Sequence, residues 1–270
     1  MTYKLGNYGK VNSRTTWECL APRALIIFLK YPEPGKVKTR LAKVIGHEKA
    51  CEAYIQLAEG IIKNILLKKT KLYDIYIFFT PADKGCEIND WLKRMVNIDF
   101  RSDVYAIPQE GEALGEKMLN AFQYVFWDKV LCCKIKNIQH DNKEGIRETV
   151  PVPSFFTIAG GKKFLSCNSM IIGTDCPDVD VALIESAFEA LQENDVVVGP
   201  CEDGGYYLLG MSKLVPGLFA NISWSTHEVF RQTMKKIQEN NLSCHVLKTL
   251  ADIDTAEDYY RYANIRCTSQ

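Results

Sequence analysis

The chain has 270 residues, of which 47% are hydrophobic and 11% aromatic, so it can bury a sizeable core and is not a disordered or low-complexity protein. Its 33 Lys and Arg residues balance 33 Asp and Glu residues, and the resulting net charge of zero argues against nucleic acid or an anionic membrane surface as a partner. No apolar run approaches the roughly 18 residues of a membrane span, and the N-terminal segment has no apolar signal core.

The cysteines indicate the cellular compartment of the protein. There are ten of them, and no two have the C-x-x-C spacing that is typical of zinc sites and thioredoxin-like motifs. We interpret them as small buried hydrophobic residues of a protein in the reducing cytoplasm.

Short apolar runs alternate with amphipathic segments along most of the chain. The apolar runs predict buried strands over residues 24–29, 74–80, 98–107, 169–173 and 195–199. The segments between them carry apolar residues at helical spacing, and they predict helices from residue 48, over 87–95, over 114–125 and over 181–191. This alternation indicates an α/β fold with a mostly parallel central sheet and helices on both faces.

The last part of the chain departs from this alternation. A glycine turn leads into a strand over 204–211, and residues 245–250 predict a final strand. Ser225 with Glu228, and Thr255 with Asp258, have the spacing of capping boxes that begin helices, with Trp224 and Val229 as a hydrophobic staple for the first.

Two segments lie outside the strand-helix pattern. Residues 1–22 precede the first strand as an N-terminal extension, and residues 129–168 separate a helix from a strand where an α/β unit usually needs about 2 to 6 residues. We expect the second to be a surface insertion, formed by a hairpin and a loop, in one domain over 23–264 that is followed by a tail at 265–270. The simpler interpretation is a solvent-exposed surface segment without a function of its own. The alternative is a lid that helps to bind an acceptor.

The first predicted strand ends in a loop suited to an anion. The segment from Lys30 to Leu41 combines a Pro/Gly turn at Gly35 with the cations Lys38 and Arg40, and a helix start follows. Lysine supplies a point charge and arginine a bidentate fork, a combination that fits a diphosphate. The segment matches neither the G-x-x-x-x-G-K-[ST] phosphate loop nor the G-x-G-x-x-G fingerprint.

Acidic residues follow the later strands. Asp175 comes directly after the 169–173 strand and suits the coordination of a hard divalent cation, whereas Asp178 and Asp180 are explained by capping of the next helix. After the 195–199 strand, Glu202 and Asp203 offer a base, and Gly204, Gly205 and Tyr206 allow a ligand to approach the backbone closely. Asp252 and Asp254 precede the last helix, where capping is the simpler explanation. Strand ends of a parallel sheet meet at one edge, so we expect one shared site.

Several segments together resemble a known family, in order from about Ala24 to Tyr262: KYPEPGKVKTRL, QEGEALGEKM, IIGTDCPD, VVVGPCEDGGYYLLG, LFANISWST and LADIDTAEDY. The chain is similar to the bacterial glycosyltransferase A-like family of nucleotide-diphospho-sugar transferases, some of which are associated with radical-SAM and arsenosugar pathways. The resemblance implies a single-domain glycosyltransferase A-like fold and a nucleoside diphosphate sugar as donor.

The resemblance also implies roles for individual residues. Lys38 and Arg40 would contact the donor diphosphate, and Gly115 would lie in the loop near the nucleotide. Asp175 would take the place of the metal-binding acid, and the segment from Asp203 to Tyr206 would border the acceptor or sugar. The usual D-x-D pair is replaced by the longer spacing from Asp175 to Asp178, and Cys176 stands where the family often has serine.

The leading hypothesis is therefore transfer of a glycosyl group to a small-molecule acceptor with Mg²⁺ or Mn²⁺ as cofactor, with Asp175 at the metal and Asp203 as the base. The alternative is a guanylyltransferase-like nucleotidyltransferase that acts on a small phosphorylated acceptor and releases pyrophosphate, because DIDTAED resembles the terminal motif of that group. In that case Asp175 and Asp254 would converge on the metal. A non-catalytic binding module is the third hypothesis, distinguished by ligand binding without turnover.

Overall fold

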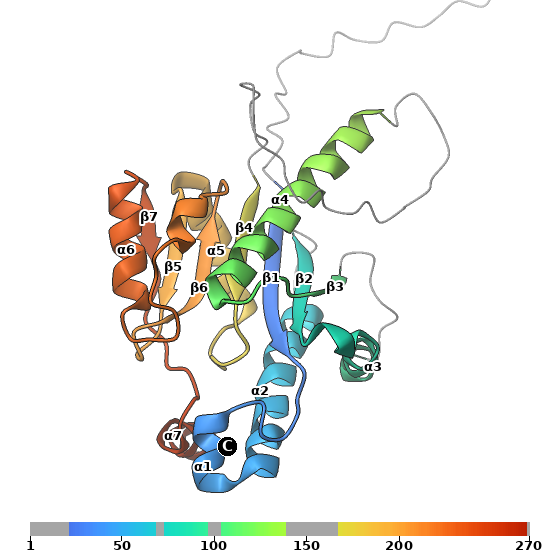
Figure 1. Ribbon diagram of the computed structural model, residues 1–270, viewed down its shortest axis with the longest axis vertical. Helices are drawn as coiled ribbons and strands as arrows, with labels where there is room; N and C mark the ends of the chain where they lie inside the picture. Colours follow the sequence, from blue (N-terminus) through green and yellow to red (C-terminus); the bar gives the residue numbers. More distant parts are fainter. Residues whose placement is uncertain (1–21, 69–72, 97–103, 139–166, 269–270) are drawn as a thin grey trace, which may run out of the picture.

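In the described part of the chain, seven strands form one sheet, in the order β3-β2-β1-β4-β6-β5-β7 (Figure 1). The computed structural model describes residues 22–68, 73–96, 104–138 and 167–268. The strands are β1 (Arg23–Lys30), β2 (Asp74–Thr80), β3 (Val104–Pro108), β4 (Asn168–Ile172), β5 (Val196–Pro200), β6 (Tyr206–Met211) and β7 (Cys244–Val246). The helices are α1 (Thr39–Ile45), α2 (His47–Lys68), α3 (Gly85–Val96), α4 (Leu114–Ile138), α5 (Val181–Glu193), α6 (Val229–Glu239) and α7 (Ala256–Thr268), with short 3₁₀ turns at Ala82–Lys84 and Pro216–Phe219.

The sheet is parallel except at one strand. β6 lies between β4 and β5 and runs antiparallel to both, whereas the pairs β1–β2, β1–β4, β2–β3 and β5–β7 are parallel. The predicted mostly parallel α/β sheet is therefore confirmed. The carboxyl ends of β1, β4 and β5 consequently open at the same edge.

Helices cover both faces of the sheet, as predicted. Helices α2, α3 and α5 pack on one face, and α4 and α6 pack on the other (Figure 1). In β1, Leu25 and Ile27 face the first layer, and Ala24 and Ile26 face the second. Burial on both sides explains why this strand is a continuous apolar run rather than an alternating one.

The first part of the predicted insertion is helical, because α4 continues through residues 129–138 as one helix of 25 residues, so any hairpin of the insertion falls after residue 138. The remainder of the insertion up to residue 166 lies outside the described residues, and Asn168 already belongs to β4. The third strand begins at Val104, and the predicted part at 98–103 lies outside the described residues, as do the extension up to residue 21 and the last two residues of the tail.

One of the two predicted capping boxes is present. Asp258 Oδ2 accepts hydrogen bonds from the backbone and hydroxyl of Thr255 at 2.8 and 2.7 Å, which fixes the start of α7. The box at Ser225 is wrong, because α6 begins at Val229 and Ser225 lies in a preceding turn with a φ of 62°. Asp180 caps α5 as expected, accepting a bond from the backbone of Leu183 at 2.8 Å.

The final strand is shorter than expected, because residues after Val246 make only isolated backbone contacts with β5 and the segment after it.

Among the described residues, no helix combines the length and the apolar character needed to cross a membrane.

Candidate functional site

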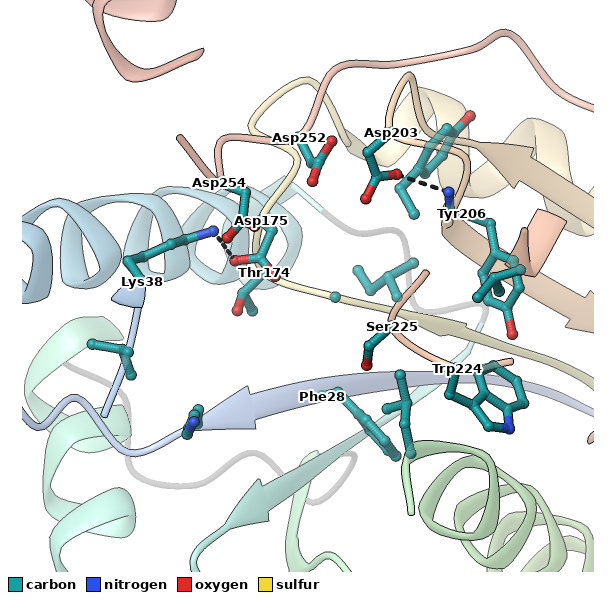
Figure 2. Close-up of a pocket in the computed structure, with 18 of the residues that line it drawn as sticks. Phe28, Lys38, Thr174, Asp175, Asp203, Tyr206, Trp224, Ser225, Asp252 and Asp254 are labelled. Carbon is teal, nitrogen blue, oxygen red and sulfur yellow. Dashed lines mark hydrogen bonds and ion pairs between the residues drawn. The ribbon is translucent and has the colours of Figure 1, made fainter. Parts of the chain in front are cut away.

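A cleft of about 960 Å³ opens where the carboxyl ends of β1 and β4 meet the loops that follow β5 and precede α7 (Figure 2). One end of the cleft is charged and the other is largely aromatic. The charged end is lined by Lys38, Arg40, Asp175, Asp203, Asp252 and Asp254, and the opposite end by Phe28, Leu114, Met118, Tyr206 and Trp224.

Lys38 and Asp175 form an ion pair at the charged end (Figure 2). Lys38 immediately precedes α1 and has a left-handed backbone, with φ of 45° and ψ of 47°. Its side chain is 4% exposed, whereas that of Asp175 is 51% exposed. The pair therefore joins a nearly buried ammonium group to a carboxylate that reaches solvent.

Arg40 and Asp254 form a second pair beside the first, with 3.0 Å between Nη1 and Oδ2. Both side chains are exposed, at 65% and 38%, so the pair adds about 0–1 kcal/mol to stability. The backbone of Ile253 donates to the carbonyl of Asp175 at 3.0 Å, which ties the loop before α7 to the end of β4. Lys38 and Arg40 are thus each paired with a carboxylate from another segment, Asp175 after β4 and Asp254 before α7.

Further carboxylates extend the charged end. Asp203 Oδ1 accepts a hydrogen bond from the backbone of Gly205 at 2.8 Å, which holds the carboxylate against the glycine turn. Cys201, Asp203 and Asp252 have potential ligand atoms within 4.8 Å of one another. Burial, with the nearby charges of Asp203 and Asp254, raises the pKa of Asp252 to about 6. Repulsion among these carboxylates favours the binding of a cation.

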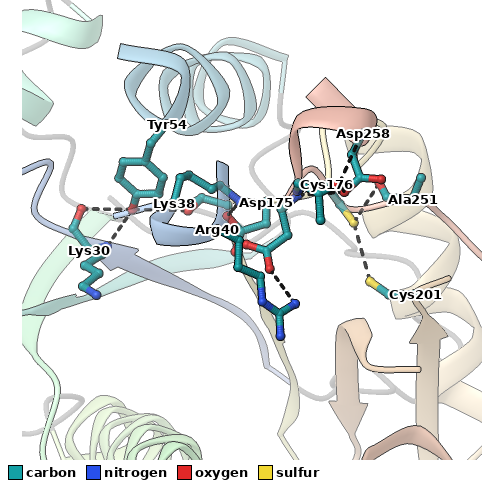
Figure 3. A network of polar contacts seen from close by, with 12 residues as sticks. Lys30, Lys38, Arg40, Tyr54, Asp175, Cys176, Cys201, Ala251 and Asp258 are labelled. Atoms are coloured by element: carbon teal, nitrogen blue, oxygen red, sulfur yellow. Dashed lines mark hydrogen bonds and ion pairs between the residues drawn. The ribbon is translucent and has the colours of Figure 1, made fainter. Parts of the chain in front are cut away.

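The floor of the cleft is built from backbone and hydroxyl groups. The Tyr54 hydroxyl accepts from the Lys30 backbone N–H at 2.8 Å and donates to its carbonyl at 2.9 Å (Figure 3). Thr174 donates to the same hydroxyl at 3.5 Å, and burial raises the pKa of Tyr54. The ends of β1 and β4 are thereby joined, while the Lys30 side chain remains exposed.

The aromatic end has fixed side-chain positions. The Trp224 ring stacks on Phe219 with 6.5 Å between centroids, and the Tyr206 hydroxyl donates to Met118 Sδ at 3.7 Å. Phe28, Tyr206 and Trp224 face the same space, away from the charged end (Figure 2). Flat apolar surfaces of this kind bind the face of a planar or sugar ring.

Comparison with known proteins identifies the fold. Residues 163–226 match the family model DUF2064, an uncharacterized protein conserved in bacteria. A candidate nucleotide-diphospho-sugar transferase from Desulfovibrio desulfuricans G20 is 27% identical, with a TM-score of 0.65, over 87% of this chain and 84% of that one. The chain has a glycosyltransferase A-like fold. The resemblance that the sequence motifs predict is therefore confirmed.

A second structure shares the fold alone. It is the 4-diphosphocytidyl-2C-methyl-D-erythritol synthase from Anaerococcus prevotii DSM 20548, at 9% identity and a TM-score of 0.50, over 91% of this chain and 99% of that one. Among curated proteins, no sequence matches the chain.

Most of the residues predicted for the site line this cleft: Lys30, Lys38, Arg40, Asp175, Asp203, Gly205, Tyr206 and Asp254. Three predicted glycines, Gly35, Gly115 and Gly204, are not among the residues that line it. Gly35 and Gly204 have φ of 81° and 88°, values that favour glycine. A Cβ at Gly115 would overlap the Trp224 indole, so this glycine lets the indole pack against the start of α4.

Sequence reasoning missed several residues of the cleft. Gln109 follows β3 and donates to the carbonyl of Phe78 at 3.0 Å, and Tyr54 lies in the helix that is predicted from residue 48. Trp224 was expected to staple a helix rather than to line a cleft. A glutamine after a strand and a tyrosine on an apolar face carry no distinguishing spacing, so neither could be found from the sequence.

Proposed function

We propose that the chain transfers a glycosyl group from a nucleoside diphosphate sugar to a small-molecule acceptor, with Mg²⁺ or Mn²⁺ bound between Asp175 and Asp254. Both carboxylates line the cleft, and carboxylate oxygens are the ligands that these ions prefer, so the residues fit the ion. Lys30 and the turn at Gly35 would complete the diphosphate loop, and the acceptor would lie near Asp203, Gly205 and Tyr206.

The observation that carries this proposal is the pairing of Lys38 with Asp175 and of Arg40 with Asp254. Two cations and two anions alternate within one cleft. A metal-bound diphosphate carries charges of both signs. Its phosphate oxygens can pair with Lys38 and Arg40 in place of the two carboxylates, and its metal ion can then bind those carboxylates. The site would exchange its internal ion pairs for those with the ligand without exposing an unpaired charge.

The proposed reaction forms a bond between an acceptor oxygen and the anomeric carbon and breaks the bond from that carbon to the diphosphate. The acceptor proton passes to Asp203, which the Gly205 N–H holds in place. The leaving diphosphate gains negative charge, which Lys38 and Arg40 stabilise at fixed positions. The bound metal ion would contribute Lewis-acid stabilisation of the same leaving group. At the other end, Trp224 and Phe28 would bind the planar or apolar part of a substrate.

A two-step experiment tests the proposal. Thermal shifts with UDP-, GDP-, ADP-, CDP- and TDP-sugars, with and without Mn²⁺, identify a donor by a metal-dependent rise in melting temperature. Release of the nucleoside diphosphate from that donor is then measured with candidate acceptors for the wild type and for Arg40→Ala and Asp175→Ala. Turnover by both variants at a near wild-type rate contradicts the proposal.

Nucleotidyl transfer is the second candidate, and the placement of two paired carboxylates in one cleft favours it. Asp175 and Asp254 could together hold the metal of a nucleoside triphosphate, whose α-phosphorus the acceptor phosphate would attack with release of pyrophosphate. Pyrophosphate formation from any of the four triphosphates with phosphorylated acceptors identifies this activity. Its absence, together with sugar-nucleotide turnover, excludes it.

A further inference from the structure

Two thiols meet beside the charged end of the cleft. Cys176 follows Asp175 after β4, Cys201 follows β5, and their sulfur atoms are 3.7 Å apart (Figure 3). Cys176 is 3% exposed, and its thiol also lies 3.4 Å from the carbonyl of Ala251. The proposed transfer reaction uses neither thiol.

Two carboxylates adjoin this thiol pair. The ligand atoms of Cys201, Asp203 and Asp252 lie within 4.8 Å of one another, and Cys201 contacts Cys176. Cys201, Asp203 and Asp252 are partly or fully exposed, which provides a route of entry for an ion. The ligand atoms of Cys201, Asp203 and Asp252 therefore converge from the end of β5 and the loop before α7, and the Cys176 sulfur adjoins them through its contact with Cys201.

Backbone hydrogen bonds hold these three segments together. Glu202 donates to the carbonyl of Leu250 at 3.0 Å, and Leu250 donates to that of Pro200 at 3.1 Å. Ile253 donates to the carbonyl of Asp175 at 3.0 Å, so the segments carrying Cys176 and Asp252 are joined as well. The ligand groups are thus positioned by the fold rather than by one flexible loop.

We propose that Cys176, Cys201, Asp203 and Asp252 form a binding site for a thiophilic divalent cation, with Zn²⁺ as its representative. Two sulfurs at about 2.3 Å from a tetrahedral zinc lie about 3.8 Å apart, which agrees with the 3.7 Å between Cys176 and Cys201. Zn²⁺ accepts mixed thiolate and carboxylate ligands, whereas Mg²⁺ and Mn²⁺ prefer oxygen. Lys38 and Arg40, the two cations of the proposed diphosphate loop, form their ion pairs with Asp175 and Asp254. Their ion pairs therefore do not involve Asp203 or Asp252, which can bind an added cation.

Binding has two consequences for the chemistry of the cleft. Each thiol gives up a proton to solvent when its sulfur binds the ion, so up to two protons leave per Zn²⁺. The ion would also hold Asp203, the proposed base, and Zn²⁺ would then inhibit a transferase that Mn²⁺ activates. The binding itself does not depend on which reaction the protein catalyses.

Cobalt spectroscopy tests the site directly, because Co²⁺ bound to thiolate has an intense near-ultraviolet charge-transfer band that Co²⁺ bound to oxygen lacks. The full chain is titrated with Co²⁺ under a non-thiol reductant and then with Zn²⁺. Wild type is expected to bind one Co²⁺ per chain with the thiolate band, which Zn²⁺ abolishes. Cys86→Ser, which removes an exposed thiol on α3, is the matched control and should retain the band.

Cys201→Ser is expected to lose most of the band, and Cys176→Ser to do the same. Asp252→Asn should weaken Co²⁺ binding at least tenfold while leaving the band position unchanged. Because Cys176 is buried, melting temperatures of all variants are recorded, and the partly exposed Cys201 carries the test if Cys176→Ser does not fold. The proposal is overturned if wild type shows no thiolate band, or if the band survives Cys201→Ser or disappears in Cys86→Ser.

Discussion

Lys38 and Asp175 pair a nearly buried ammonium group with a carboxylate that is half exposed. The asymmetry has a functional implication, because Asp175 can rotate into the cleft towards a cation while Lys38 stays fixed by its buried stem. Fixed positive charge is the more effective stabiliser of a leaving diphosphate, since it needs no reorganisation as negative charge develops.

The first prediction concerns this fixed charge. Lys38→Asn should lower kcat for sugar-nucleotide turnover by about 10²- to 10³-fold, equivalent to about 2.7–4 kcal/mol of barrier. Asparagine tolerates the left-handed backbone that Lys38 adopts, so the loss in the free energy of unfolding should come from the buried stem and its ion pair and amount to about 0.5–3 kcal/mol. Steady-state kinetics and urea unfolding measure the two effects. Lys43→Gln, on the exposed side of α1, is the control, and a near wild-type kcat for Lys38→Asn would remove Lys38 from the mechanism.

The second prediction concerns the glycine behind the aromatic end. A Cβ at residue 115 would overlap the Trp224 indole, so Gly115→Ala should destabilise the fold by about 1–3 kcal/mol and shift Trp224. Gly60→Ala is the matched control, because Gly60 is an exposed residue of α2 with open space around it. That variant should gain about 0.5–1 kcal/mol.

Chemical denaturation measures both stabilities, and tryptophan fluorescence reports the displacement of the indole. In a Trp224→Ala background, Gly115→Ala should cost little further stability, because the indole that the new Cβ would overlap is absent. Equal effects of the alanine substitutions at residues 60 and 115 would contradict the packing argument.

The sheet was predictable because its central strands are buried on both faces. Residues 24–29 and 74–80 are apolar at nearly every position, a pattern that few other structures produce. Helix ends were less predictable. The Ser225 and Glu228 spacing matches a capping box, but the left-handed turn at Ser225 places the start of α6 later, and only the tertiary structure determines that.

The charged residues of the site were predictable as strand-end residues, but their partners were not. Lys38 and Arg40 could be placed near carboxylates because parallel strands end at one edge, yet nothing in the spacing indicates that Lys38 faces Asp175 and Arg40 faces Asp254. The same holds for Cys176 and Cys201. A search for C-x-x-C cannot find two thiols that approach each other from separate strands.

The third prediction concerns pH and a carboxylate away from the cleft. The Lys213 ammonium, 2.8 Å away, and the Ser243 backbone N–H hold the pKa of Asp195 below its usual value. A lowered pKa in the folded state stabilises the protein above the usual pKa of about 4, and this contribution is lost as the pH falls through the folded value. Asp195→Asn should therefore cost about 1 kcal/mol at pH 7 and progressively less below about pH 4.

Urea unfolding of wild type and Asp195→Asn across this range measures the difference. Asp178→Asn, at an exposed position, is the control and should have nearly the same free energy of unfolding as wild type in these measurements. If the difference in the free energy of unfolding between wild type and Asp195→Asn stayed constant between pH 7 and pH 3.5, the effect would come from the shape of the side chain rather than from its charge.

The fourth prediction separates the carboxylates that are proposed to bind the metal from an exposed carboxylate of the same loop. Mn²⁺ should stabilise the protein through Asp175 and Asp254, so the asparagine variants at either position should bind Mn²⁺ at least tenfold more weakly, a loss of about 1.4 kcal/mol. Asp178→Asn, in the same loop but outside the cleft lining, should bind Mn²⁺ as wild type does. Thermal shift against Mn²⁺ concentration measures the affinities, in a Cys201→Ser background that removes the thiol site.

The metal-free proteins distinguish the two carboxylates further. Asp175→Asn leaves the nearly buried Lys38 ammonium without its charged partner and should lower the melting temperature before any metal is added. Asp254→Asn breaks only an exposed pair with Arg40 and should leave that temperature almost unchanged. If Asp178→Asn weakened Mn²⁺ binding as much as Asp175→Asn, or if neither Asp175→Asn nor Asp254→Asn weakened it, the metal would have to bind elsewhere in the cleft.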